Sequence, residues 1–402
     1  MQITKTRAAA QVSLLALSLL VPSLAMAQDA SATPDITEEM EAAPAPEAPA
    51  TDAPATDAAG ATDEVTTEVA ESKDSGTVDR SVPEMAAVIE KLMELGAKPV
   101  STLTVEEART QPTPTDAVMA VLEEEGKSTA PEEVGAVEDI TIPGAEGDLQ
   151  ARVYTPAGEG PFPTIVYFHG GGWVIADLDV YDASARALTN QAGAVVVSVH
   201  YRQGPENKFP AAHDDAVAAY SYVIENAGSW NADSDRVAVA GESAGGNLAI
   251  NVAIAARDQQ LNTPEAVLAV YPVAGADMNT ESYIENQNAV PLGKGDMMWF
   301  AENYLNSMDE ATDPRIDIVG SADLADLPPV TIVAAEIDPL RTEGETLNDK
   351  LEAAGVDVEY QLWDGVTHEF FGMAAQVPQA KEAQDFAGER LRDALGSEQA
   401  GM

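Results

Sequence analysis

The chain contains no cysteine, and this absence removes several kinds of chemistry at once. It excludes disulfide bonds, thiolate metal sites, a cysteine nucleophile and a lipidated cysteine. Basic residues are also scarce, because 21 Lys and Arg stand against 68 Asp and Glu, for a formal net charge of −47. Since nucleic-acid phosphates and anionic lipids attract Lys and Arg, this balance argues against a nucleic-acid partner and against docking on an anionic membrane.

The apolar stretch near the N-terminus is too short to span a bilayer. Val12–Leu24 covers about 13 residues and includes serine and proline, whereas a span needs roughly 20 apolar residues. Two basic residues and no acid precede the stretch, and an Ala-Met-Ala site follows it. These features predict a secretory signal peptide over residues 1–27. We therefore expect no stable membrane span and a location in the periplasm or outside the cell.

The next segment, residues 28–80, consists mostly of Ala, Pro, Thr, Asp and Glu. It holds 14 acids and 2 bases, a net charge of −12. A segment with so little to bury and so much like charge is expected to be disordered. It could serve as a spacer that holds the folded part away from a surface, or it could be solvated filler. Residues 81–402 keep a net charge of −37 and are expected to form one folded domain.

The domain begins with helical patterning and continues with alternating strands and helices. The apolar positions expected to be buried in the first two helices are Met85, Val88, Ile89, Leu92 and Leu95, then Val118, Met119 and Leu122. From Pro163 onward, six short apolar runs alternate with amphipathic helices: TIVYFH, AVVVSVHY, RVAVAG, AVLAVYP, VTIVAAE and VEYQLW. This alternation predicts an α/β fold with a mostly parallel sheet and helices on both faces.

A glycine-rich turn after the run RVAVAG gives the first chemical signal. GESAGG at residues 241–246 lies between an expected strand and an expected helix, and G-x-S-x-G in that context is a nucleophile elbow. The sharp turn leaves no room for bulky side chains two positions from the serine, and the hydroxyl projects at the positive end of a helix. We expect Ser243 to be a nucleophile and the N–H of Ala244 to face an oxyanion. The alternative is a glycine-rich turn without catalytic function.

A second glycine-rich run, HGGGW, follows the run TIVYF. Glycines let backbone N–H groups approach a ligand without interference from Cβ, and an HGGG loop forms the oxyanion hole of lipases and esterases. Gly171 and Gly172 are the expected donors. His169 is expected to brace the loop by hydrogen bonding rather than to act as a base. The alternative is a flexible loop that serves packing alone.

A serine nucleophile needs a base, usually histidine, to take its proton. In folds with a nucleophile elbow the acid and then the histidine follow the serine along the chain. Only one of the four histidines, His368, follows Ser243. His200 and His213 precede the elbow and are expected to be structural or surface residues.

An acid must then orient the imidazole and stabilise its cation. Asp338 is favoured because it follows the run VTIVAAE at the same sheet edge as the elbow. Glu336 is the next choice. Asp364 and Glu369 lie too close in sequence to His368 to approach its ring easily from behind.

Five motifs appear in order along the chain: HGGGW, YRQGPENKFPAAHDD, GESAGG, DPLRTEG and THEFF. Together they make the chain resemble the hormone-sensitive-lipase-like family of α/β-hydrolases (bacterial family IV), which are mostly carboxylesterases. The resemblance covers about residues 81–395, and the acidic linker lies outside it. It implies an α/β-hydrolase fold with an eight-stranded sheet and a helical cap built from about residues 81–130 and 277–308.

The resemblance also implies roles for individual residues. It assigns the nucleophile, its two partners and the oxyanion donors to Ser243, Asp338, His368, Gly171, Gly172 and Ala244. The chain departs from the family where Ala, His and Pro are usual, at Gly204, Asn207 and Lys208, and where Asp is usual, at His200. Those positions are in loops beside the site, so the departures affect local detail and not the triad.

These residues predict a serine carboxylesterase that hydrolyses short-chain esters through an acyl-enzyme, with no metal or cofactor. Five aromatic residues are candidates for an apolar substrate pocket, although each could equally be core packing: Trp173, Trp299, Phe300, Phe370 and Phe371. A deacetylase of carbohydrate or an amidase stays open, because elbow and triad serve all acyl transfers. A non-catalytic binding module is disfavoured because the full residue set is present. The expected partner is a small ester, and the expected state is a monomer or dimer.

Overall fold

The structure of the chain is a computed structural model that describes residues 76–396. The expected signal peptide and most of the expected linker lie outside the described residues. Helix α1 (Thr77–Arg80) falls inside the range 28–80, so ordered structure begins before residue 81, earlier than the composition indicates. Partners far along the chain hold this helix, because Arg80 hydrogen-bonds Asn286 at 2.8 Å and pairs with Glu285 at 3.0 Å. Between residues 76 and 396, no helix is both long and apolar enough to cross a membrane.

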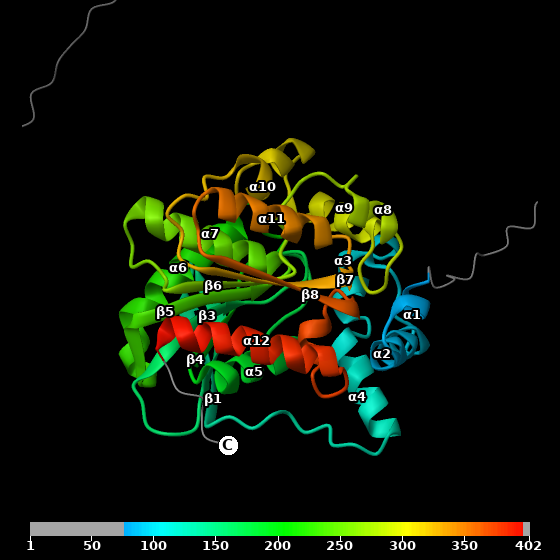
Figure 1. Cartoon of the computed structure of the whole chain (residues 1–402), viewed down its shortest axis with the longest axis horizontal. Coiled ribbons are helices and arrows are strands. Elements are labelled where there is room, and N and C mark those ends of the chain that lie inside the picture. Colours follow the sequence, from blue (N-terminus) through cyan, green and yellow to red (C-terminus); the bar gives the residue numbers. More distant parts are fainter. Residues whose placement is uncertain (1–75, 397–402) are drawn as a thin grey trace, which may run out of the picture. The chain divides into compact units, whose positions relative to one another are not determined.

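The centre of the fold is an eight-stranded sheet with the order β1-β2-β4-β3-β5-β6-β7-β8 (Figure 1). The strands are β1 (Ala136–Pro143), β2 (Asp148–Thr155), β3 (Phe162–Phe168), β4 (Val195–His200), β5 (Ala232–Glu242), β6 (Ala266–Val270), β7 (Val330–Ile337) and β8 (Val358–Thr367). Strand β2 pairs antiparallel with β1 and β4, and every other neighbouring pair is parallel. The expected mostly parallel sheet of an α/β-hydrolase is therefore confirmed.

Helices cover both faces of this sheet, as the alternating pattern predicts. One face carries α6 (Ala211–Asn226), α7 (Ala244–Gln259) and α11 (Arg341–Ala353), and the other carries α5 (Asp182–Ala192) and α12 (Pro378–Leu395) (Figure 1). Side chains alternate along each strand, so Val166 and Phe168 of β3 belong to the core under α7 while Ile165 and Tyr167 belong to the opposite core.

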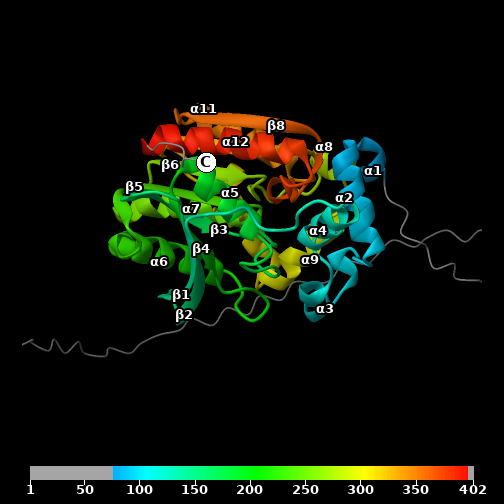
Figure 2. The same ribbon diagram turned by 90° about the horizontal axis from the view of Figure 1, so that it is seen from below.

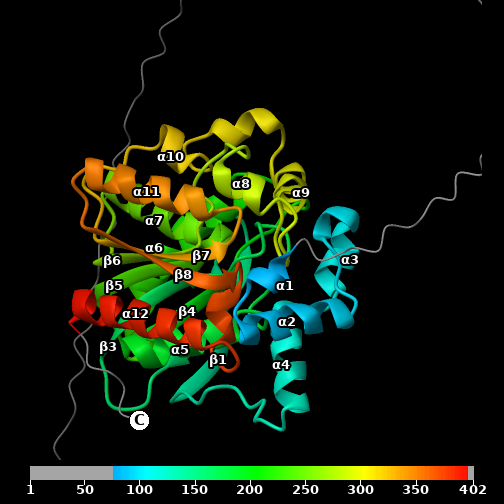
Figure 3. The ribbon, with the colours of Figure 1, turned by 45° about the vertical axis from the view of Figure 1, so that its right-hand side comes forward.

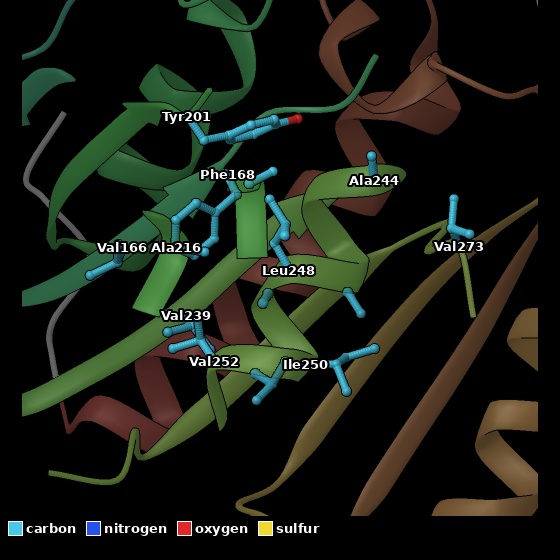
Figure 4. Packing of buried hydrophobic residues seen from close by; sticks show 14 of the residues in the cluster. Val166, Phe168, Tyr201, Ala216, Val239, Ala244, Leu248, Ile250, Val252 and Val273 are labelled. Carbon is cyan, nitrogen blue, oxygen red and sulfur yellow. The ribbon is translucent and has the colours of Figure 1, made fainter. Parts of the chain in front are cut away.

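Helix α7, which begins directly after the nucleophile elbow, is buried along most of its length. Its sequence AGGNLAINVAIAARDQ has few charged residues, which is typical of a helix covered on more than one side. Figure 4 shows Leu248 and Val252 of this helix packed beside Phe168 and Val239 of the sheet. Burying one such side chain contributes about 1.5–3 kcal/mol, so this packing fixes the start of the helix against the strand ends.

A separate group of helices, here called the cap, gathers at one end of the sheet (Figures 2 and 3). It consists of α1, α2 (Pro83–Glu94), α3 (Val105–Thr110), α4 (Pro114–Glu124), α8 (Glu281–Glu285) and α9 (Lys294–Tyr304). Hydrogen bonds that join its two sequence segments include those from Ser101 N–H to Asp296 at 3.0 Å and from Trp299 Nε1–H to the carbonyl of Leu103 at 3.1 Å. The short elements η1 (Val100–Thr102), η2 (Ala227–Trp230), η3 (Met308–Thr312), α10 (Ile318–Ser321) and η4 (Phe370–Met373) complete the fold.

Most of the apolar positions expected in α2 and α4 are buried, but two are not. Leu95 is 41% exposed and Met119 is 37% exposed. Leu95 lies just past the end of α2, where the helical face no longer continues. Met119 lies about 100° around the helix from the buried Val118, which turns it toward solvent.

Candidate active site

The serine of GESAGG lies in a sharp turn between β5 and α7. Ser243 has φ 57° and ψ −118°, a conformation that non-glycine residues rarely adopt. A Cβ on Gly241 would lie 2.1 Å from the carbonyl oxygen of Gly245, and a Cβ on Gly245 would lie 1.9 Å from that of Phe168. The turn therefore requires glycine on both sides of the serine. The N–H of Ser243 also donates to Val270 at 2.9 Å, which ties the turn to strand β6.

The histidine and the favoured acid meet at the ends of β8 and β7. His368 Nδ1 lies 2.6 Å from Asp338 Oδ2, and both side chains are almost completely buried. The other oxygen of Asp338 accepts a hydrogen bond from Leu340 N–H at 2.8 Å, so the carboxylate is fixed in position. Burial alone would lower the pKa of His368, but the Asp338 carboxylate and two further acids outweigh it, so the pKa is raised.

The competing acids have other partners. Glu336 Oε2 accepts a hydrogen bond from Gly365 N–H at 2.7 Å, and Asp364 is exposed. Glu369 lies on the Nε2 side of the imidazole, with Oε1 at 3.9 Å. Of the four candidates, Asp338 is therefore the one at Nδ1, where an orienting acid belongs.

Ser243 and His368 both line a cavity of about 1250 Å³ between the strand ends and the cap. Its wall includes Leu92 of α2 and Met297 of α9, so both segments of the cap contribute. Within residues 76–396, no cluster of three His, Asp or Glu side chains is arranged to hold a metal ion. The groups that line the described cavity include a serine hydroxyl, an imidazole and the glycines of the HGGGW loop.

The two expected oxyanion glycines line the same cavity. Gly171 has φ 91° and Gly172 has φ 58°, and the carbonyl of Gly171 accepts from Val174 and Ile175 N–H at 3.0 and 2.9 Å. Among the described residues, the backbone N–H groups of Gly171, Gly172 and Ala244 donate to no other protein group. Buried N–H groups without a partner are rare in proteins, so three beside one serine are suited to bind a developing negative charge.

The other three histidines have structural partners. His169 Nδ1 lies 2.8 Å from the carbonyl oxygen of Gly170 and Nε2 lies 3.1 Å from His200, as expected of a residue that braces the loop. Burial lowers the pKa of His169 to about 3 and that of His213 to about 4, so both are neutral. His213 joins Tyr304 of the cap to α7, and His200 reaches the cavity wall.

The aromatic pocket expected from the sequence is only partly correct. Trp173 and Phe300 line the cavity, but the prediction is wrong for Trp299, Phe370 and Phe371. The indole of Trp299 donates to the carbonyl of Leu103 and so connects the cap segments. Phe370 and Phe371 are fully buried in the core beside α12, because the chain turns inward at η4 directly after the histidine loop.

Two buried acids near the site, Glu242 and Glu343, were not predicted from the sequence. Glu242, beside the nucleophile, accepts hydrogen bonds from Tyr167 and Tyr271 at 2.6 and 2.5 Å, and burial raises its pKa to about 7. Glu343 Oε2 accepts from Ala274 and Gly275 N–H at 2.7 and 2.8 Å and supports the loop after β6, and burial raises its pKa to about 8. Each acid lies inside one of the sequence motifs, GESAGG or DPLRTEG, which was the available signal.

Comparisons with known proteins give the same architecture. A family model described as the alpha/beta hydrolase fold matches residues 165–372. The carboxylic ester hydrolase LipN of Mycobacterium tuberculosis is 39% identical over 243 residues, which cover 59% of this chain and 65% of that protein, just under two thirds of its length. The ethyl acetate hydrolase of Pseudomonas putida is 31% identical over 323 residues, which cover 78% of this chain and 99% of that protein.

A solved structure also superposes on this chain, in agreement with the sequence matches. The hyperthermophilic esterase from the archaeon Pyrobaculum calidifontis superposes with a TM-score of 0.69 at 34% identity, over 76% of this chain and 97% of that one. At 34% identity, the similarity indicates common ancestry as well as a shared fold. The chain belongs to the hormone-sensitive-lipase-like family of α/β-hydrolases, a family of carboxylic ester hydrolases.

Proposed function

We propose that the protein is a serine carboxylesterase in which Ser243, His368 and Asp338 form a catalytic triad. The observation that carries this proposal is the 2.6 Å contact between His368 Nδ1 and Asp338 Oδ2 at the wall of the cavity that also holds Ser243. A carboxylate at Nδ1 holds the imidazole with Nε2 free to accept a proton from the serine. The similarity to known esterases supports the same reaction class.

The reaction follows from these positions. His368 removes the Ser243 proton as the oxygen attacks the ester carbonyl, and Asp338 stabilises the imidazolium that forms. The N–H groups of Gly171, Gly172 and Ala244 stabilise the tetrahedral oxyanion, each by about 3 kcal/mol on the scale of known oxyanion donors. The alcohol departs with the proton from His368. Water, activated by the same imidazole, then releases the acid from the acyl-enzyme.

We propose short-chain carboxylic esters as substrates. One similar protein is named for ethyl acetate hydrolysis, and its match spans 99% of its length. The apolar rings of Trp173 and Phe300 on the cavity wall suit an acyl or aryl group. The cavity of about 1250 Å³ is larger than a short ester requires, so the alcohol portion has room to be bulky.

The test compares wild type with Ser243→Ala on p-nitrophenyl esters from acetate to palmitate. Wild type should be fastest on the shortest esters, and Ser243→Ala should lose at least about 10⁴-fold in kcat while folding normally. A folded wild type with no activity above the Ser243→Ala background would refute the proposal. Acetylated xylan and an aryl amide form the further arms, and faster turnover of either would reassign the substrate class to a deacetylase or an amidase.

We also propose that residues 1–27 direct export to the periplasm or beyond. The support is the charged start, short apolar stretch and Ala-Met-Ala site of the sequence. Expression of the full chain in a Gram-negative host should give a processed protein that begins at Gln28 in the periplasmic or culture fraction. Cytoplasmic protein that keeps Met1 would contradict export. The expectation of a monomer or dimer stays a prediction, to be checked by light scattering.

A further inference from the structure

A second carboxylate lies close to the histidine, on the side opposite Asp338. Glu369 Oε1 is 3.9 Å from His368 Nε2, whereas Asp338 contacts Nδ1. The Glu369 side chain is 20% exposed and lines the same cavity as Ser243. Glu369 is therefore near the ring nitrogen that exchanges protons with the serine and the leaving group.

The position of Glu369 is fixed by a buried tyrosine. The hydroxyl of Tyr181 lies 2.7 and 2.8 Å from the two carboxylate oxygens of Glu369 and donates to this carboxylate. Tyr181 is 4% exposed, and its hydroxyl packs so tightly against the oxyanion loop that a Cβ on Gly170 would lie 2.2 Å away. Tyr181, which packs against the oxyanion loop, therefore fixes the position of the Glu369 carboxylate in the cavity.

The backbone at Glu369 is also unusual. Its φ is 71°, in the left-handed region that favours glycine. Holding a glutamate there costs on the order of 1 kcal/mol, and such strain persists mainly where function requires a particular side chain. The strain and the tyrosine contact are independent signs that a carboxylate is needed at this position.

The groups that face His368 from the surrounding elements are mostly acidic. Asp338 follows β7, Glu242 ends β5, and Glu369 belongs to the loop of the histidine itself. The ring of Tyr271, after β6, lies 4.4 Å from the imidazole and hydrogen-bonds Glu242. Against the effect of burial, the three carboxylates together raise the pKa of His368.

We propose that Glu369 is a positioning residue that stabilises protonated His368 from the Nε2 side and thereby raises the lowest pH at which His368 can act as a base. The proposal rests on the catalytic role given to His368 above. When the imidazole takes the Ser243 proton, the new N–H forms at Nε2, on the side of Glu369, and a nearby carboxylate favours that cation. The same attraction keeps the imidazole protonated at lower pH, where it cannot accept a proton.

The main test is Glu369→Gln, which keeps an oxygen to accept from Tyr181 and removes only the charge. The acid limb of kcat/KM against pH should move down by about one pH unit, with a several-fold lower kcat at alkaline pH. Asp364→Asn is the matched control, because Asp364 is an exposed acid of β8, five residues before Glu369, and its removal should leave the acid limb in place. An unchanged midpoint in Glu369→Gln would overturn the proposal.

Two further variants separate charge from folding. Glu369→Gly relieves the strained φ and also removes the charge, so it should stay folded and give the same downward shift. Tyr181→Phe frees the carboxylate and should give a smaller shift in the same direction. If Glu369→Gly leaves the midpoint of the acid limb unchanged while Glu369→Gln moves it, loss of the charge is not the cause of the shift and the proposal fails.

A measurement without turnover distinguishes this proposal from the proposed function. Proton–nitrogen NMR of His368 can be followed against pH in Ser243→Ala, with and without Glu369→Gln. The imidazole pKa should fall by about one unit when the charge is removed, whether or not esters are substrates. A shift with no esterase activity in wild type would refute the function alone, and activity with no shift would refute the role of Glu369 alone.

Discussion

The contacts that fix the strand ends around Ser243, His368 and Asp338 differ in length and burial from the contacts that fix the cap. At the strand ends, the key contacts are short and buried: Asp338 to His368 at 2.6 Å, and Glu242 to Tyr167 at 2.6 Å. The cap is joined by contacts that are only partly buried, such as Trp299 to Leu103 at 3.1 Å.

This difference follows from the local environment. Hydrogen bonds to charged groups are stronger in a buried site of low dielectric constant than beside water. The strand ends are therefore a preorganised, stiff region, whereas the cap rests on contacts that cost less to break. Changes at the strand ends should alter kcat or folding strongly, and changes in the cap should alter mainly KM.

The largest effect should come from Asp338→Asn. The amide can still accept from Leu340 N–H, but it no longer stabilises the imidazolium and favours the wrong tautomer of His368. We expect kcat to fall by about 10⁴-fold with little change in the melting temperature. Steady-state kinetics with circular dichroism would check this, and retention of full rate would transfer the role to another acid.

The stiffness of the elbow should appear in Gly245→Ala. The added Cβ would lie 1.9 Å from the carbonyl oxygen of Phe168. This oxygen belongs to the backbone of a central strand, so it cannot move away as the end of a flexible side chain could. We expect a loss of about 3 kcal/mol in the free energy of unfolding, together with loss of activity. Gly228→Ala is the control, because open space surrounds that position, and its stability should hardly change. Equal stability of the two variants would contradict a tightly packed elbow.

The acidic surroundings of His368 predict the pH dependence of the wild type. The pKa of His368 is raised above 6.5. The imidazole is therefore mostly protonated, and unable to act as a base, until the pH exceeds this raised pKa. On the acid side, kcat/KM should therefore fall about tenfold per pH unit, with a midpoint above 6.5. A pH–rate profile on a neutral ester checks this, and a midpoint at or below 6.5 would contradict a raised pKa of His368.

The smallest effect should come from the cap variant Trp299→Phe. It removes the hydrogen bond to the carbonyl of Leu103, which joins the two cap segments, at a cost of about 1 kcal/mol. KM should rise up to about fivefold while kcat changes less than about twofold. Glu302→Gln, an exposed residue of the same helix, should leave both constants unchanged. A large fall in kcat would show that the cap is as stiff as the strand ends.

The fold was predictable because strands and helices have periods that the sequence displays directly. The same is true of the site residues at strand ends: parallel strands deliver Ser243, Asp338 and His368 to one edge of the sheet, whatever the intervening lengths. The pocket lining was less predictable. Phe370 and Phe371 follow the histidine directly, but a turn inward at η4 buries them in the core.

The sequence by itself determined the reaction class, since glycines, serine, histidine and acid occur in motifs whose spacing dictates local backbone geometry. Tertiary structure alone decided which of the aromatic residues line the cavity and where Glu242 and Glu369 lie relative to His368. Those outcomes depend on chain segments far apart in sequence, such as Tyr181 against Glu369. Short-range patterns cannot specify such contacts, because a side chain's neighbours and its electrostatic environment are set only when the whole core has packed.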